Sequence, residues 1–190
     1  VYKRQGFIIA TKNLYDDGLL REDYYKKVME NADLIESVID YDKDYTFDYF
    51  ALTTLIRAYL LKFDNKTIER PQDLWMRVTL TVTGNEFNLD KIKETYKSLS
   101  TGMYTHATPT LFNSGLKMQQ LSSCFLIGME DDSIEGIFNT IKDCALISKT
   151  AGGIGMHAHN IRGSGSRIKS TNGKSNGLIP FLKIFNETAK

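Results

Sequence analysis

The chain has 190 residues, a formal net charge of +1 at neutral pH and 42% hydrophobic residues. A charge this close to zero argues against an extended nucleic-acid surface or a polybasic membrane patch. No apolar run reaches the roughly 18 residues that a membrane span requires, and the apolar part of the N-terminus is too short for a signal peptide. We therefore expect a cytoplasmic protein with one large or two small domains.

Before residue 118 the sequence pattern is mostly helical. Apolar residues recur at three- and four-residue spacing over 19–39 and again over 47–62, which is typical of one buried helix face. A polar connection over 40–46 separates the two segments. The first half therefore predicts a helical domain.

Local signals then predict two further helices. A loop ends at Pro71, a residue that suits the first turn of a helix over 72–83. Asn88 or Asp90 is expected to cap a helix over 89–102, which ends in a glycine.

After residue 118 the pattern changes to alternating strands and helices. Acidic residues and Ser133 mark a helix start. The expected elements are a strand over 121–129, a helix over 134–151, a strand over 152–161, a loop over 162–177 and a final helix over 178–190. Strand, helix and strand in this order predict an α/β unit with parallel strands.

The two cysteines are too few for a disulfide scaffold or a four-ligand metal site. Cys144 lies within a predicted helix, and we interpret it as a core residue. Cys124 follows two serines on a predicted strand, where alternation puts Ser123 on the opposite face. His157 and His159 share a strand face without an evident third ligand, so we predict surface or structural histidines and no metal site.

Two polar segments are candidate anion sites. The loop over 162–177 carries Arg162, Arg167, Lys169 and Lys174 among glycines and serines, and glycines let backbone N–H groups approach a phosphate. A flexible basic surface loop is the alternative that composition alone favours, and neither the Walker pattern nor the Rossmann fingerprint is present. Hydroxyls and amides over 107–115 suit a phosphate or sugar, but an ordinary turn is the favoured interpretation.

Several segments in register resemble the large subunit of class I ribonucleoside-diphosphate reductase. They are FDYFALTTLIRAYLLK, IERPQDLWMRV, THATPTLFNSG, QLSSCFL, DDSIEGIFNTIKDCALISKTAGGIG and IRGSGSRIKSTNGKSNGLIPFLKIFNETA. The resemblance covers roughly residues 40–190. It implies an α/β fold in which a helical N-terminal domain, residues 1–118, leads into the first strands and helices of a ten-stranded α/β barrel, residues 119–190, which is incomplete here.

The resemblance implies an enzyme that reduces ribonucleoside diphosphates to deoxyribonucleoside diphosphates for DNA synthesis, by thiyl-radical chemistry with redox cysteines. Cys124 corresponds to one cysteine of the reducing pair. Thr108 and Ser123 match positions that contact the substrate, and Gly152 and Gly153 match backbone that lines its pocket. The radical cysteine and the second reducing cysteine have no match, so we expect this piece to be inactive alone.

The resemblance also implies an allosteric site for ATP or a deoxynucleoside triphosphate at a dimer interface. A carboxylate suits ribose hydroxyls and cations suit phosphates. The matching positions are Asp132, Ser133 and Ile134 for the sugar and base, Lys149 and Arg162 for the phosphates, and Lys169 and Ser170 in the adjoining loop.

The partners implied are a second copy of the chain through the effector-site helices and a metal-containing small subunit that supplies the radical. Thioredoxin or glutaredoxin is the implied reductant, and no cofactor is expected to bind this chain directly. Nucleic acid and membrane are not expected partners. Two alternatives stay open: a cobalamin-dependent (class II) ribonucleotide reductase and a non-catalytic nucleotide-binding module.

Overall fold

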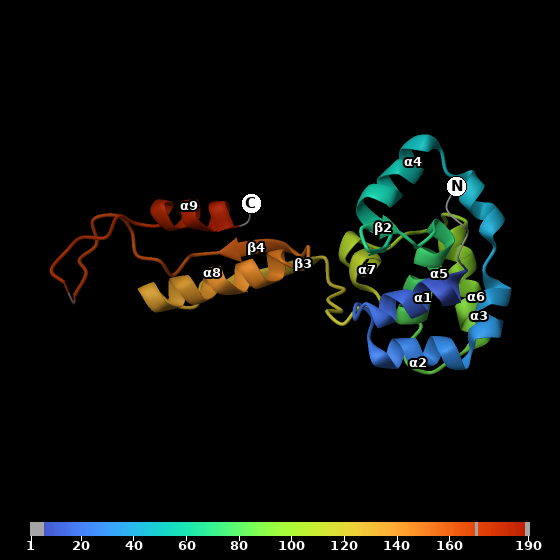
Figure 1. Cartoon of the computed structure of the whole chain (residues 1–190). Helices are drawn as coiled ribbons and strands as arrows, with labels where there is room; N and C mark the ends of the chain where they lie inside the picture. Colours follow the sequence, from blue (N-terminus) through green and yellow to red (C-terminus); the bar gives the residue numbers. More distant parts are fainter. Residues whose placement is uncertain (1–5, 170, 189–190) are drawn as a thin grey trace. The chain divides into compact units, whose positions relative to one another are not determined.

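The computed structural model describes residues 6–169 and 171–188, and the chain divides into two compact units, Val1–Leu121 and Ser122–Lys190. The first unit is almost entirely helical and the second mixes strands with helices (Figure 1). Within the described residues, no helix is both long enough and apolar enough to cross a membrane.

The first unit is built around one buried helix. Every residue of α5 from Pro71 to Leu80 is buried, so this helix occupies the centre of the hydrophobic core. The elements of this unit are α1 (Phe7–Asp16), α2 (Glu22–Glu30), α3 (Ala32–Val38), η1 (Tyr41–Thr46), α4 (Tyr49–Thr54), η2 (Leu55–Tyr59), β1 (Lys62–Phe63), β2 (Lys66–Thr67), α5 (Pro71–Val82), α6 (Leu89–Ser100) and α7 (Thr108–Asn113).

The helices with strong local signals form where they were predicted. Pro71 is the first residue of α5, where its missing N–H costs nothing. Asn88 caps α6, because its side chain accepts a hydrogen bond from the backbone N–H of Lys91 at 3.0 Å. The alternative cap, Asp90, is wrong, since this residue lies within the first turn of the helix.

Other parts of the first unit differ from the prediction. The apolar pattern over 19–39 is divided between α2 and α3, because Asn31 between them leaves the helical conformation. The polar connection over 40–46 forms the 3-10 helix η1. The predicted loop after residue 62 holds a hairpin of β1 and β2, whose turn residues Asp64 and Asn65 have φ values of 49° and 58°, as a tight hairpin turn requires.

A buried ion pair of Arg77 and Glu69 ties α5 to the end of α7. The Arg77 Nε donates to Glu69 Oε1 at 2.5 Å, and Arg77 Nη1 donates to the carbonyl oxygen of Ser114 at 2.8 Å. Both charged side chains are only 2% exposed. Because each charge is satisfied only by the other and by nearby backbone, loss of one partner would leave a buried unpaired charge.

The second unit is a parallel strand pair with helices packed on one of its faces. Its elements are β3 (Cys124–Gly128), α8 (Ile134–Ser148), β4 (Gly153–His157) and α9 (Ile179–Thr188). The strands pair in register from Cys124 opposite Gly153 to Gly128 opposite His157, so the predicted parallel α/β unit is confirmed. No closed barrel is present in the described part of the chain, and the ten-stranded barrel stays a prediction.

The two faces of this sheet have different surroundings. Side chains of α8 and α9 pack on the face that carries Ile154 and Met156, and Cys144 is buried there, which confirms its prediction as a core residue. Burial raises the pKa of the Cys144 thiol. The opposite face is exposed and consists of Cys124, Leu126, Gly128, Gly153, Gly155 and His157.

Candidate functional site

Cys124 is the first residue of β3, and its thiol is free and exposed. The Ser123 hydroxyl donates to Cys124 Sγ at 3.7 Å. Because β3 begins at Cys124, Ser123 precedes the strand, and the alternation expected for the two serines does not apply. The arrangement presents a thiol and a hydroxyl together on the open face of the second unit.

The two neighbouring glycines have different physical roles. A Cβ on Gly153 would lie 3.9 Å from Cys124 Sγ and 3.3 Å from the carbonyl oxygen of Ser123, so glycine here keeps the space over the sulfur free. A Cβ on Gly152 would lie 2.7 Å from Ile147 Cγ2 and 2.8 Å from Phe125 Cε2. Gly152 is therefore required by the close packing of α8 against β3.

Thr108 begins α7 in the first unit, half-buried, with its hydroxyl 3.3 Å from the Tyr59 hydroxyl. Its contact with a substrate held at Cys124 stays a prediction. The neighbouring hydroxyls of Thr110 and Ser114 form hydrogen bonds with the backbone. Thr110 donates to the carbonyl oxygen of Leu121 at 3.1 Å, and Ser114 donates to the carbonyl oxygen of Thr110 at 2.6 Å. The interpretation of 107–115 as an ordinary turn is wrong, because Thr108–Asn113 form the helix α7 and Ser114 is its C-terminal cap.

A cavity of about 640 Å³ lies in the second unit, between the start of α8, the loop after β4 and α9. Five predicted effector residues line it: Asp132, Ser133, Ile134, Arg162 and Lys169. Arg167, one cation of the candidate anion loop, also lines it, whereas Ile137, Ser166, Ile168, Ser175 and Phe181 were not predicted individually as site members. Predicted Ser170 lies outside the described residues.

One end of this cavity is polar and fixed in place. The Ser133 side chain accepts a hydrogen bond from the backbone N–H of Gly136 at 3.0 Å and so caps α8. The Arg162 Nε donates to Asp132 Oδ2 at 2.5 Å, and its Nη2 donates to the carbonyl oxygen of Asp132 at 3.0 Å. Arg162 therefore fastens the loop to the helix start and fixes the direction of the Asp132 carboxylate.

The remaining lining separates positive charge from apolar surface. Arg162, Arg167 and Lys169 face a single lining carboxylate, that of Asp132, so the cavity carries more cations than anions. Ile134, Ile168 and Phe181 supply an apolar wall. A cationic side and an apolar side in one cavity suit a ligand that joins phosphates to a flat ring system, as a nucleotide does.

Lys149 does not join this cavity in the same copy of the chain. It follows the last residue of α8, whereas Asp132 precedes the first. At 1.5 Å per residue, the helix puts about 22 Å between its two ends. The structure therefore brings five of the predicted effector residues together and separates Lys149 from them.

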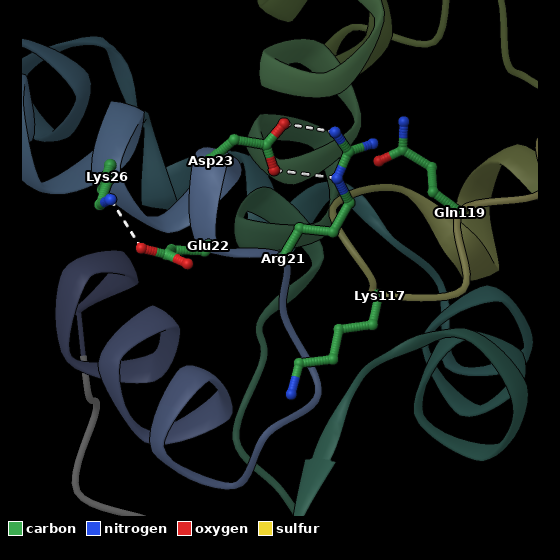
Figure 2. Close-up of a pocket in the computed structure, with 6 residues that line it drawn as sticks. All are labelled: Arg21, Glu22, Asp23, Lys26, Lys117 and Gln119. Atoms are coloured by element: carbon green, nitrogen blue, oxygen red, sulfur yellow. Dashed lines mark hydrogen bonds and ion pairs between the residues drawn. The ribbon is translucent and has the colours of Figure 1, made fainter.

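A second cavity, of about 660 Å³, lies in the first unit and contains none of the predicted site residues. In Figure 2 the guanidinium of Arg21 faces the carboxylate of Asp23, and Lys26 faces Glu22. Both carboxylates are thus neutralised by neighbours on the same short segment, and such exposed ion pairs contribute little to the stability of the fold. This open depression offers no chemistry that the sequence predicted.

His157 and His159 are both exposed, as predicted, but β4 ends at His157, so the strand predicted over 152–161 is shorter and His159 lies in the turn after it. His157 Nδ1 and His159 Nδ1 lie 3.1 Å apart. Within the residues that the structure describes, no group of three or more His, Cys, Asp or Glu side chains is arranged to hold a metal ion.

Two family descriptions match successive parts of the chain. Residues 45–119 match the all-alpha domain of ribonucleotide reductase, and residues 122–190 match the barrel domain of ribonucleotide reductase. The chain is 51% identical over 172 residues to the ribonucleoside-diphosphate reductase large chain 2 of Saccharomyces cerevisiae, with 90% of this chain and 20% of that protein covered.

Two further relatives are similar over the same region. The large subunit of ribonucleoside-diphosphate reductase from Arabidopsis thaliana is 50% identical over 172 residues, 90% of this chain and 21% of that protein. The Dictyostelium discoideum large subunit is 48% identical over 190 residues, 100% of this chain and 22% of that protein. The chain thus spans about a fifth of the length of these curated relatives.

Proposed function

The chain belongs to the family of ribonucleotide reductase large subunits, and from this premise we propose that it supplies one reducing cysteine and an effector pocket to a ribonucleoside-diphosphate reductase. The whole enzyme would reduce ribonucleoside diphosphates to deoxyribonucleoside diphosphates in the cytoplasm. The relatives' names specify a diphosphate reductase with a large subunit, which favours this class over a cobalamin-dependent reductase or a non-catalytic module.

The observation that carries the proposal is the free, exposed thiol of Cys124 beside the Ser123 hydroxyl. In the reducing step, two thiols form a disulfide and release two electrons and two protons, while the ribose exchanges a hydroxyl for hydrogen and water leaves. Cys124 supplies one sulfur of that pair. A dithiol protein such as thioredoxin or glutaredoxin then reduces the disulfide. A metal-containing small subunit supplies the radical that activates the substrate.

The exposed surface around Cys124 also supplies the proposed contacts with the substrate. Ser123 offers a hydroxyl next to the sulfur, and Gly153 leaves room for a ligand above it. Gly152 contributes backbone at the same edge while its missing side chain permits packing. Thr108 is the substrate contact assigned to the helical unit.

The cavity at the start of α8 is the proposed effector site. Asp132 would accept hydrogen bonds from ribose hydroxyls, Ser133 and Ile134 would contact the sugar and base, and Arg162 and Lys169, with Ser170 beside it, would face the phosphates. The effector would bias the loop conformation and thereby substrate choice.

The position of Lys149 supports a homodimer in this proposal. Because α8 separates it from Asp132, Lys149 can approach an effector only from the second copy. Ile134, Phe138 and Leu146 on α8 are more than half exposed, and an apolar helix surface of this kind is typical of an interface. The paired α8 helices would then complete two effector sites.

The test is the Cys124→Ser variant of the full-length protein that contains this chain, assayed with dithiothreitol as reductant. We expect turnover to be lost and effector binding to be retained, because the sulfur is chemically required and the effector cavity lies elsewhere. Cys144→Ala is the matched control, since Cys144 is buried in the core, and it should retain turnover. Equal turnover of Cys124→Ser and the parent enzyme would overturn the proposal.

A further inference from the structure

The loop after β4 is an ordered hairpin rather than a flexible basic segment. Arg167 and Lys174 lie opposite each other in an antiparallel bridge. The backbone N–H of Ile168 donates to the carbonyl oxygen of Gly173 at 2.8 Å, and that of Ser175 donates to Ser166 at 2.8 Å. The two hydrogen bonds lie on either side of Arg167 and Lys174, and none joins these two residues directly. Arg167 and Lys174 are therefore a non-hydrogen-bonded pair, the type of antiparallel pair in which opposite side chains lie closest together.

Backbone contacts at the base of the hairpin hold this pair in place. The N–H of Gly165, at φ 83°, donates to the carbonyl oxygen of Ser175 at 2.8 Å. Gly177, at φ 78°, passes so close to Ser164 that a Cβ on it would lie 2.9 Å from the Ser164 backbone nitrogen. Glycine is required at both positions, because it adopts positive φ without a steric penalty and lets the two backbone segments approach closely.

Two cations that face each other across a bridge repel one another. Neither Arg167 nor Lys174 forms an ion pair within the described part of the chain; the carboxylate that lines the cavity, Asp132, is bound by Arg162. Lys169 lies on the same hairpin and adds a third positive charge. A multiply charged anion placed against these side chains would remove the repulsion and neutralise them.

We propose that Arg167 and Lys174 form a cross-strand clamp for the triphosphate of the effector, while Arg162, which also faces the phosphates, holds the Asp132 carboxylate in position. This inference rests on the proposed effector site and adds two residues to it. The division of labour follows from the contacts: Arg162 is held by Asp132 at 2.5 Å, whereas Arg167 and Lys174 have exposed side chains. Three hairpin cations match a triphosphate better than a single phosphate.

The experiment measures binding of dTTP and of inorganic tripolyphosphate to the full-length protein by calorimetry. Arg167→Gln and Lys174→Gln should each weaken binding of both probes at least about tenfold, the loss expected for one charge-assisted contact. Arg167→Lys should recover part of that loss. Lys183→Gln, which removes an exposed cation of α9 outside the cavity, should bind both probes as the parent does.

The melting temperature without nucleotide provides the second measurement. It should stay the same or rise in both glutamine variants, because each change removes a like-charge contact. A fall in both would show a structural role and overturn the clamp. Unchanged dTTP affinity in both variants, or an equal loss in Lys183→Gln, would also overturn the clamp while leaving the effector site intact. Failure of the parent protein to bind dTTP would instead overturn the proposed effector site.

Discussion

At the scale of single residues, the two cysteines differ in their surroundings, because the thiol of Cys124 is exposed and that of Cys144 is buried. The core role of Cys144 could be predicted from its place within a helix, and the structure confirms it. The roles of Cys124 and Asp132 came from resemblance, because nothing in a strand pattern indicates which face stays open. Arg167 was noticed only as one of several loop cations, since its pairing with Lys174 depends on the hairpin register.

Gly153 provides a residue-scale prediction about thiol access. The Gly153→Val variant should slow alkylation of Cys124 by iodoacetamide several-fold, because even a Cβ would lie 3.9 Å from the sulfur and the added methyl groups extend farther. Labelling rates followed by mass spectrometry would measure the effect.

The matched control is Gly163→Val, where an added Cβ would meet no atom within 4 Å. It should leave the labelling rate of Cys124 unchanged. If Gly153→Val were alkylated as fast as the parent protein, the space above the sulfur would not depend on this glycine.

At the scale of elements, prediction succeeded where the signal is local. Pro71 and Asn88 mark the starts of α5 and α6 because proline and a capping side chain act within one turn. The break at Asn31 was missed because the apolar spacing continues through it. The hairpin after β4 lies beside the start of α8, and both line the same cavity. This contact is between segments far apart in the sequence, so the spacing of residues does not predict it.

The buried pair between Arg77 and Glu69 leads to a prediction about how elements are joined. Arg77→Met should lower the free energy of unfolding by about 3–5 kcal/mol, because Glu69 would stay buried without its cation. Urea denaturation with fluorescence detection of Trp75, the single tryptophan, would measure the change.

Two further variants separate burial from charge pairing. Arg77→Met combined with Glu69→Gln should recover part of the lost stability, since an amide can still accept from the Leu61 N–H that now binds Glu69 at 2.9 Å. Lys26→Met, which breaks an exposed pair with Glu22, should leave the free energy of unfolding nearly unchanged. A double variant no more stable than Arg77→Met would contradict the explanation.

At the scale of the whole molecule, the charged groups inside the helical unit make its stability depend on pH. Burial raises the pKa of Asp73 to about 7, although hydrogen bonds from the Arg70 backbone and the Tyr41 hydroxyl act in the opposite direction. Burial also raises the pKa of Asp44. Glu69 and Arg70 are the other charged groups that act on Asp73. None of this could be inferred from sequence, because burial of Asp73 depends on the central position of α5.

The sign of the Asp73 effect follows from proton binding. Its pKa is higher in the folded state than the ordinary value of 3.8, so the folded state binds the proton more tightly. Protonated Asp73 thus adds to the free energy of unfolding. This contribution is complete below about pH 4, is lost as the pH rises to about 7, and is absent above that pH. Asp73→Asn should flatten this part of the dependence, as measured by urea denaturation between pH 4.5 and about 7.5. Parallel curves for the variant and the parent would contradict the assignment.

The division of the chain between Leu121 and Ser122 also affects the order in which its parts fold during translation. The helical unit is complete in the nascent chain before any of the second unit is made, and its own hydrophobic core lets it fold early. The strand that starts at Cys124 must wait until α8 and Gly153 have been synthesised, since its parallel neighbour follows that helix. During this interval both strand edges are unpaired, and chaperone protection of the growing chain would matter most there.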